Sequence, residues 1–282
     1  MAGSSMKAIK LRIKSVESTM QITKAMQLVA TSKLRRAKES MENSKPYAAI
    51  SRETLMNTVS QCDPLSTPFL THREVKKRCY VIIGGERGLA GGYNANVFKA
   101  QLAHAGDIPY CVLPIGKKAI DKYQHLQVPL LDDELDHVEG VGVSAGYGLV
   151  KKLIAGFLAG DYDELFLVYT TFLSMMSQEV RIEQLLPIEK NEEDAERRNV
   201  VTIYEPSPAE MLEMVMPDYL AGRLYSAVCD SYASEVSARR NAMDSATKNA
   251  GEMISNLRLK YNRARQGAIT QEITEIVAGA EK

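Results

Sequence analysis

The chain has 282 residues, enough for one large domain or two smaller ones, and its 35 basic and 35 acidic residues give a formal net charge of zero. The charge is unevenly distributed, since residues 1–46 hold seven Lys and three Arg against three Glu, and residues 239–265 hold seven basic residues against two acidic ones. Two basic ends exclude an evenly charged surface and favour a partner with acidic surfaces, namely nucleic acid, anionic lipid or an acidic protein.

The four cysteines lie far apart in the sequence, and none belongs to a C-x-x-C motif. This favours reduced, structural thiols of the cytosol over a disulfide framework. The N-terminal residues lead into charged positions without the apolar stretch of a signal peptide, and the most apolar window, residues 141–160, contains Lys151 and Lys152. We therefore expect neither a signal peptide nor a membrane-spanning helix.

Residues 5–60 show the period of a long helix. One stripe has alternating steps of four and three residues, the pattern of a coiled-coil seam, at Ile9, Ile13, Val16, Met20, Thr23, Gln27, Ala30, Leu34, Ala37 and Met41. Thr23 and Gln27 weaken this seam in its middle. A second stripe appears there, at Ile22, Met26 and Val29, so the helix either twists around its partner or contacts two partners. Near Pro46 we expect a kink or the entry into a globular body.

After the prolines of residues 63–68 the period changes to that of alternating strands and helices. We predict strands at 79–83, 108–115 and 164–170, and helices at 93–104, 117–124 and 143–158. This alternation implies a mostly parallel sheet with helices on its faces. We further predict a half-exposed edge strand at 180–186, a charged loop at 189–199 and a last strand at 201–204.

The C-terminal stretch has the period of a second and longer helix. From residue 209 to 278 the only proline is Pro217, and small or apolar residues recur at Val236, Met243, Ala246, Ala250, Met253, Leu257 and Ala264. About 60 helical residues span about 90 Å, longer than any compact domain of this chain needs, so we expect the helix to serve a partner. Its tail carries apolar residues that require a socket in that partner, at Ile269, Ile273, Ile276 and Val277.

A long helix, an alternating module and a longer helix follow one another, so the two terminal helices can pair antiparallel. The predicted fold is therefore α/β, with a long antiparallel coiled coil of the N- and C-terminal helices and a central Rossmann-like α/β domain. We place the boundaries at 1–60 for the first helix, 61–205 for the α/β domain and 206–282 for the second helix.

The glycine-rich turn at residues 84–92 is the candidate for ligand chemistry, because it lies between a strand and a helix as a nucleotide-binding turn does. Its glycines at 85, 88 and 91 do not match G-x-G-x-x-G, and no Lys-Ser or Lys-Thr follows as in a P-loop. A tight turn with positive φ or close backbone packing explains it better than phosphate binding. The four histidines have no ligand-like spacing, so we expect no metal, no cofactor and no catalytic residue.

The basic ends allow three interpretations. A solvated helix surface needs no partner, and an acidic protein fits if the helix is inserted into it. Nucleic acid suits the charge, but Tyr261 is the only aromatic residue in 239–265, so we expect no nucleic acid. The rivals to a partner-binding helix are therefore a nucleotide-binding α/β protein and a basic coiled coil that binds nucleic acid or serves as a scaffold.

Three stretches resemble the gamma subunits of bacterial F-type ATP synthases. They are ITKAMQLVA at 22–30 with Lys33, GLAGGYN at 88–94, and NAMDSATKNA at 241–250, which continues through YNRARQ at 261–266 to ITQEITEI at 269–276. The resemblance covers the whole length in the right order. It implies a central rotor shaft that couples proton-driven rotation of the c ring to ATP synthesis or hydrolysis, with no active site of its own.

The resemblance also implies partners and a location. The coiled coil would thread the hexamer of alpha and beta subunits, with the α/β domain outside it, near the epsilon subunit and the ring of c subunits. The chain would lie at the cytoplasmic face of the bacterial plasma membrane as a peripheral protein without entering the bilayer.

Eight partner contacts follow from the resemblance by motif position. Lys24 and Met26 match the place where the shaft meets acidic and apolar parts of the beta subunit. The contacts with a beta loop are carried over to Arg265 and Gln266, with Thr270 and Glu272 nearby, and the contacts near the c ring and the epsilon subunit to Tyr204 and Glu205.

Overall fold

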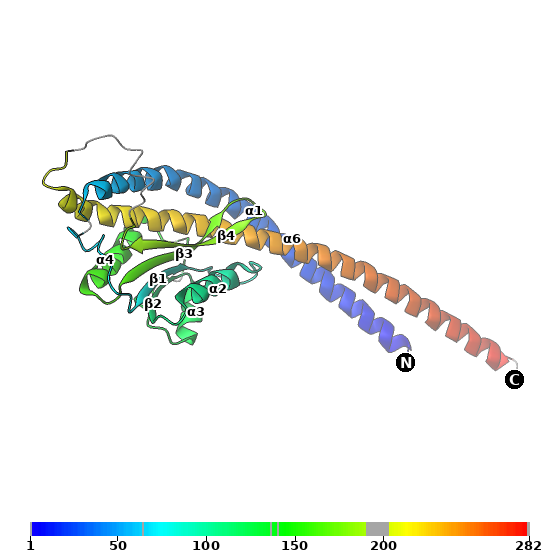
Figure 1. The fold of residues 1–282 in the computed structure, drawn as a ribbon. Coiled ribbons are helices and arrows are strands. Elements are labelled where there is room, and N and C mark those ends of the chain that lie inside the picture. The colour runs from blue at the N-terminus through cyan, green and yellow to red at the C-terminus, as the bar shows by residue number, and fades with distance from the viewer. Residues whose placement is uncertain (1, 64, 136, 140, 190–202, 281–282) are drawn as a thin grey trace. The chain divides into compact units, whose positions relative to one another are not determined.

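The computed structural model describes residues 2–63, 65–135, 137–139, 141–189 and 203–280 (Figure 1). The chain divides into two compact units. We call Met1–Thr31 with Arg239–Lys282 the helical unit, and Ser32–Ala238 the α/β unit. The assignment of residues 1–60, 61–205 and 206–282 to three domains stays a prediction.

Two long helices contribute to both units. They are α1 (Ala2–Gln61) and α6 (Pro208–Ala280), and they confirm the helices predicted at the two ends of the chain. Pro46 lies inside α1 and Pro217 inside α6, so neither proline ends its helix. At the start of α6 the Glu210 N–H donates to Ser207 Oγ at 3.3 Å. This N-cap, followed by a proline at the first helical position, is the reason α6 begins there.

The α/β unit contains a four-stranded sheet of β1 (Arg78–Ile83), β2 (Tyr110–Ile115), β3 (Glu164–Phe172) and β4 (Gln178–Leu186). The strand order is β2-β1-β3-β4, with β2, β1 and β3 parallel and β4 antiparallel to β3. This confirms the mostly parallel sheet and the predicted edge strand. Of the last predicted strand, residues 201–202 lie outside the described residues, and Ile203 and Tyr204 form no strand. Most of the predicted loop at 189–199 also lies outside them.

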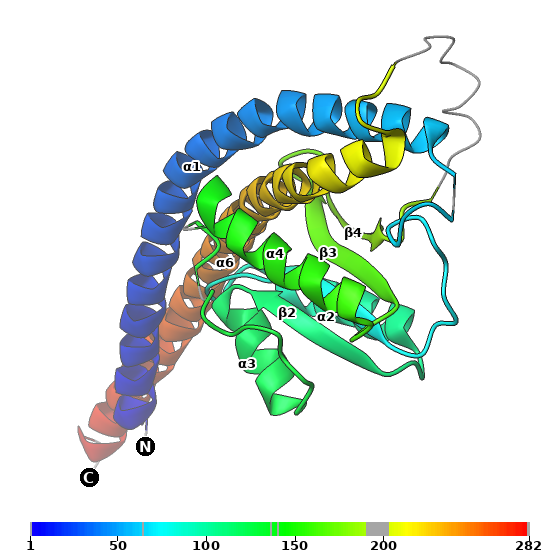
Figure 2. The same ribbon diagram turned by 90° about the vertical axis from the view of Figure 1, so that its left-hand side faces the viewer.

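Helices cover both faces of the sheet, as the alternating pattern predicts (Figure 2). On one face, Tyr80 and Ile82 of β1 pack with α2 (Tyr93–Ala105) and α3 (Lys117–His125). On the other face, Val81 and Ile83 belong to a larger core with α4 (Val143–Ala159) and with parts of α1 and α6. Successive strand residues point to opposite faces, so one continuous apolar run serves both cores.

A partly buried ion pair attaches α6 to the sheet within the α/β unit. Arg223 Nε donates to Glu183 Oε1 of β4 at 2.9 Å, and Arg223 Nη2 donates to the Tyr169 hydroxyl of β3. The Arg223 side chain is only 14% exposed and that of Glu183 30%. Burial alone would lower the pKa of Arg223, but the hydrogen bond and charge of Glu183 outweigh it and raise that pKa. The guanidinium therefore stays charged and fixes α6 over β3 and β4.

We predict that Arg223→Ala lowers the free energy of unfolding by about 2–4 kcal/mol, because it leaves the partly buried Glu183 carboxylate without its partner. Urea denaturation followed by circular dichroism measures this change. The control is Arg181→Ala on β4, whose pair with Glu179 is 3.8 Å long with side chains 53% and 59% exposed. An exposed pair of this kind contributes less than about 1 kcal/mol. Equal losses in the two variants would contradict the assignment.

Candidate functional site

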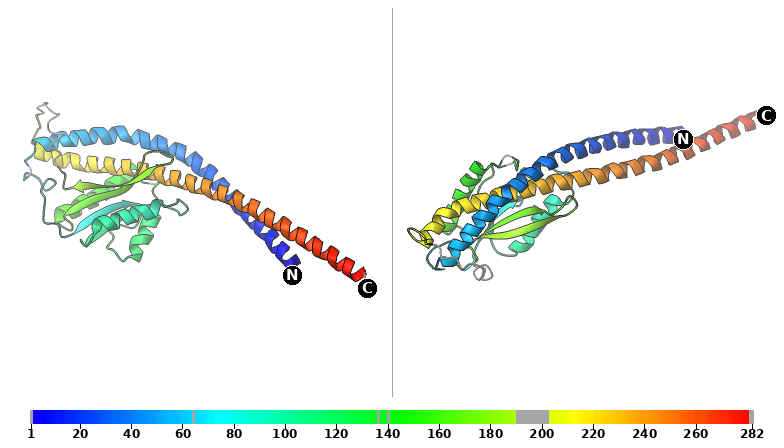
Figure 3. Two further views of the ribbon diagram at one scale, coloured as in Figure 1. Left: turned by 45° about the vertical axis from the view of Figure 1, so that its right-hand side comes forward. Right: turned by 90° about the horizontal axis from the view of Figure 1, so that it is seen from above.

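The helical unit is held together by an antiparallel seam between α1 and α6 (Figure 3). Val16 of α1 packs with Ala250 and Ile254 of α6, and all three are at most 8% exposed. Ile13, Met20 and Leu257 pack around them. The steps of four and three predicted along α1 therefore mark the buried face, and the antiparallel pairing is confirmed.

The predicted buried stripe of α6 is wrong at one position. Met253 is 45% exposed, whereas Ile254 is 6% exposed and takes its place in the seam. Ala250 is followed by an apolar residue at both i+3 and i+4, and both spacings fit a helical stripe. The way the two helices wind around each other decides whether Met253 or Ile254 enters the seam. The sequence of one helix alone does not reveal that winding.

Polar side chains pair with each other where the seam was expected to be weak. The hydroxyls of Thr23 and Thr247 lie 2.8 Å apart, and Gln27 Nε2 donates to Asp244 Oδ1 at 2.9 Å. A hydrogen bond from Lys248 is the largest cause that holds the pKa of Asp244 below its ordinary value. These pairs form only in one register of the two helices, so they specify it at some cost in stability.

A second face of α1 in the helical unit exposes apolar side chains. Leu11 is 62% exposed, Ile22 59% and Val29 60%. Leu11 and Val29 are 18 residues apart, which is five helical turns, and Ile22 lies near the same line. The predicted second stripe is thus present at Ile22 and Val29, while Met26 is half-buried. The predicted stripe does not include the exposed Leu11 and Leu28, although spacings of 11 and 18 residues to Ile22 and Val29 place Leu11 on it.

The end of α6 is apolar and exposed. Ile269, Ile273, Ile276 and Val277 are between 48% and 71% exposed. Within the helical unit α6 continues beyond the N-terminus of α1, so no other helix described for this unit lies beside these side chains (Figure 3). Apolar side chains gathered in this way mark a surface for another protein.

The eight residues carried over by the resemblance occupy separate places. Lys24 and Met26 lie on α1, and Arg265, Gln266, Thr270 and Glu272 lie on α6 with exposed side chains. Because Thr23 pairs with Thr247, the exposed Lys24 lies level with the part of α6 that is 18 residues before Arg265, or about 27 Å along the helix. In the α/β unit Tyr204 accepts a weak hydrogen bond of 3.4 Å from Thr58, and Glu205 is exposed.

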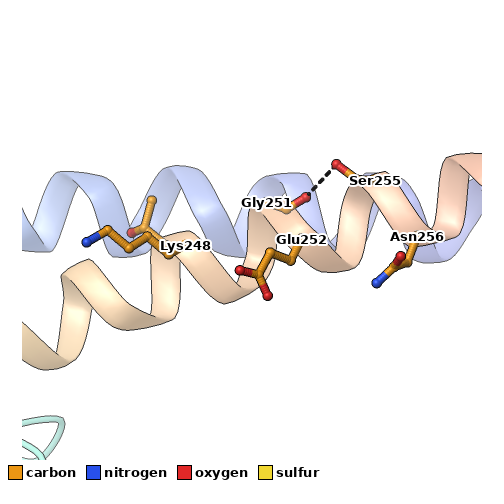
Figure 4. A pocket seen from close by; sticks show the side chains of 6 residues that line it. Lys248, Gly251, Glu252, Ser255 and Asn256 are labelled. Atoms are coloured by element: carbon orange, nitrogen blue, oxygen red, sulfur yellow. Dashed lines mark hydrogen bonds between the residues drawn. The ribbon is translucent and has the colours of Figure 1, made fainter.

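A shallow groove of about 660 Å³ also lies on the helical unit (Figure 4). It is lined by Thr247, Lys248, Gly251, Glu252, Ser255 and Asn256, all from α6. Gly251 creates it, because a Cβ built there would meet nothing within 4 Å. The lining comes from one helix and is open to solvent, so the groove does not enclose a small molecule.

The glycine-rich turn of the α/β unit is closely packed, as the favoured interpretation predicts. Gly91 has a positive φ of 58°, and a Cβ at Gly84 would lie 3.0 Å from the Ala119 Cβ. A Cβ at Gly85 would lie 2.8 Å from Glu235 Oε1, so a side chain of α6 already lies against this turn. Among the described residues, no group of three His, Cys, Asp or Glu side chains could hold a metal ion. None of the helices described combines the length and apolarity needed to cross a bilayer.

Sequence comparisons agree over nearly the full length of the chain. The model of the ATP synthase family matches residues 5–282. The ATP synthase gamma chain of Ruminococcus albus is 45% identical over 276 residues, which is 96% of each chain. That of Alkaliphilus metalliredigens is 43% identical over 99% of each chain, and the sodium ion specific gamma chain of Acetobacterium woodii is 39% identical over 97% of each.

Solved structures share the fold. A chain in the rotor of the Euglena gracilis mitochondrial ATP synthase covers 95% of this chain and is itself covered to 99%, with a TM-score of 0.67 and 16% identity. A chain in the central stalk and c ring of the Tetrahymena thermophila enzyme gives a TM-score of 0.60 at 22% identity, over 80% of this chain and 99% of that one. The match over residues 5–282 and the identities of 39–45% leave no other assignment: the chain belongs to the family of ATP synthase gamma chains.

Proposed function

We propose that this chain is the central rotor shaft of a bacterial F-type ATP synthase, a non-catalytic subunit that couples rotation of the c ring to ATP synthesis or hydrolysis. Its partners are the alpha and beta subunits, the epsilon subunit and the c ring, at the cytoplasmic face of the plasma membrane. The observation that carries the proposal is the helical unit, in which apolar side chains at 48–71% exposure cover the end of α6.

The exposed surfaces of α1 and α6 in the helical unit are suited to contact with subunits that surround the helix pair. The face of α1 with Leu11, Ile22 and Val29 is apolar, whereas Arg265 and Gln266 of α6 offer guanidinium and amide donors. A helix pair with chemically different sides presents a different surface to each subunit around it. Three otherwise equivalent catalytic sites around such a pair therefore have different free energies at any one angle.

Rotation of the shaft then changes which catalytic site is favoured. The coupling works in both directions, because a conformational change at one site that alters its contact with the shaft also alters the preferred shaft angle. In this scheme Lys24 and Met26 meet the beta subunit on the α1 side, while Arg265, Gln266, Thr270 and Glu272 meet it on the α6 side. Tyr204 and Glu205 of the α/β unit contact the c ring or the epsilon subunit.

The rival functions make different predictions. A nucleotide-binding α/β protein would bind ATP in the absence of other subunits, and we expect isothermal titration to detect no binding, because the glycine-rich turn already contacts Glu235. A nucleic-acid-binding coiled coil would require a polar basic tail, but the end of α6 is apolar. The discriminating experiment is affinity purification of the tagged chain from its own cells. Recovery of alpha and beta subunits supports the shaft, and their absence refutes it.

We predict that Arg265→Ala combined with Gln266→Ala weakens assembly of the chain with the alpha and beta subunits by about tenfold to a hundredfold, the loss expected for polar contacts to charged groups. Titration of the chain into the alpha–beta hexamer, together with the rate of ATP synthesis in membrane vesicles, measures the effect. The control variant carries Lys117→Ala and Gln124→Ala on the exposed surface of α3. Normal assembly and full ATP synthesis in the first variant would exclude the proposed beta contact.

We also predict that two isoleucine substitutions in α6 have different effects. Ile254→Ala removes a side chain that is 6% exposed in the seam and destabilises the helical unit of the free chain by about 2–4 kcal/mol. Ile273→Ala changes a side chain that is 56% exposed, so the free chain keeps its stability within about 0.5 kcal/mol while assembly weakens. Thermal unfolding followed by circular dichroism and the same hexamer titration separate the two. A destabilised free chain with Ile273→Ala would contradict the exposed surface.

A further inference from the structure

The α/β unit has the strand order of a fold that binds ligands at a defined place. In a doubly wound sheet the ligand crevice lies outside the carboxyl ends of the strands, where the strand order reverses. Here β1 lies between β2 and β3 in the sheet, with α2 and α3 on one face and α4 on the other. The reversal therefore falls between β1 and β3, and the carboxyl end of β1 leads directly into the glycine-rich turn.

Side chains of α6 occupy this place. The pairing of β3 with β1 ends at Val168, and β3 continues to Phe172. Beyond the end of β1 the Thr170 N–H donates to Ser231 Oγ at 3.1 Å, and Ser234 Oγ donates to the Thr170 carbonyl at 3.2 Å. Both serines are fully buried. Beyond the end of β1, helix α6 thus takes the place of a neighbouring strand beside β3, and its short polar side chains allow it to approach the β3 backbone closely.

A carboxylate of the same helix lies against the glycine-rich turn. Glu235 is only 2% exposed. A Cβ built on Gly85 would lie 2.8 Å from Glu235 Oε1, 2.9 Å from its Cδ and 3.2 Å from Asn94 Oδ1. Asn94, the second residue of α2, accepts a hydrogen bond of 2.8 Å from the Gly85 N–H. The Glu235 carboxylate therefore lies beside both the turn and the first turn of α2.

At the corresponding place doubly wound folds hold the phosphate of a ligand, since the positive end of a helix and a side-chain-free turn together favour an anion. A carboxylate buried to this extent is costly unless its surroundings favour the charge. The lack of a side chain at Gly85 makes room for this arrangement, because a Cβ there would lie within 2.9 Å of the Glu235 carboxylate and would force that side chain to shift.

We propose that Glu235 is a built-in ligand: the crevice where related folds receive an anionic ligand is filled by the carboxylate of α6, which locks α6 against the sheet. Glu235 is thus a positioning residue, and the ligand site of the fold has become an attachment point for the helix. As a consequence that rests on the proposed function, this lock transmits torque between the α/β unit and α6.

The test uses the full-length chain with Glu235→Gln, which keeps the shape and removes the charge, and with Glu235→Ala, which removes the carboxylate together with one methylene. The control is Glu213→Gln, an exposed residue on the same helix. Amide hydrogen exchange of residues 84–92 and the midpoint of thermal unfolding are measured in sodium formate and in sodium chloride at equal ionic strength.

We expect exchange in residues 84–92 to rise more than tenfold in both Glu235 variants and Tm to fall by about 4–10 °C. Formate should restore part of the loss in Glu235→Ala and have no such effect on Glu213→Gln. If the variants do not fold in chloride, folding of Glu235→Ala in formate supports the proposal and no folding in formate overturns it. Exchange in Glu235→Gln equal to that of the unmodified chain, or equal formate effects on all variants, also overturns it.

The consequence for torque has a separate readout. Glu235→Gln chains assembled with alpha and beta subunits should hydrolyse ATP with reduced proton pumping in membrane vesicles, at unchanged subunit composition. If the unsubstituted chain fails to assemble with alpha and beta subunits, the proposed shaft function is refuted. The proposal for Glu235 is then still decided by the hydrogen-exchange and formate results. Normal pumping together with faster exchange would refute only the transmission of torque.

Discussion

Helix α6 runs without interruption from Pro208 to Ala280, with Pro217 inside it, so every side-chain environment along it must fit the same period of 3.6 residues. In the α/β unit, residues 226–231 and 233–237 are buried in succession, which buries the helix on all sides. In the helical unit, the buried side chains of α6 among those described are Met243, Ala250 and Ile254, which form one stripe. A single helix is thus a core element in one unit and half of a two-helix coil in the other.

The contacts in the two units differ in kind. In the α/β unit α6 is fixed by groups that fit only one arrangement, namely the Arg223–Glu183 pair and the bonds of Ser231 and Ser234 to Thr170. In the helical unit apolar packing between α1 and α6 is combined with polar pairs, among them Thr23–Thr247, Gln27–Asp244 and Glu17–Arg258. Apolar packing tolerates small shifts along the helix, whereas the polar pairs do not. They keep α1 and α6 in one register, a requirement for any helix pair that transmits a rotation.

Much of the fold could be predicted from the sequence, because strong periodicity determines it. The alternating strands and helices, the edge strand and both terminal helices follow from apolar spacing alone. Met253 was assigned to the seam in place of Ile254, since spacings of three and four residues are equivalent until the partner is present. The burial of Glu235 cannot be predicted from the sequence, because a charged residue in a helix is expected at the surface and its burial depends on packing against a turn 150 residues earlier.

Less of the candidate site than of the fold could be predicted from residue spacing. Spacing identifies the apolar tail after Ile269 and the second stripe of α1, but Arg265 and Gln266 are distinguished from other exposed polar residues only by family resemblance. Arg265 and Gln266 differ physically from residues such as Arg223 in their surroundings, because their side chains are exposed. Exposed side chains on a helix make contacts that water can replace, so exchanging one partner surface for the next costs little. Interlocked contacts like those of Arg223 would have to break at each step. A rotating shaft needs interlocked contacts where it is attached and exchangeable, exposed contacts where it turns. Helix α6 carries both kinds of contact on one backbone.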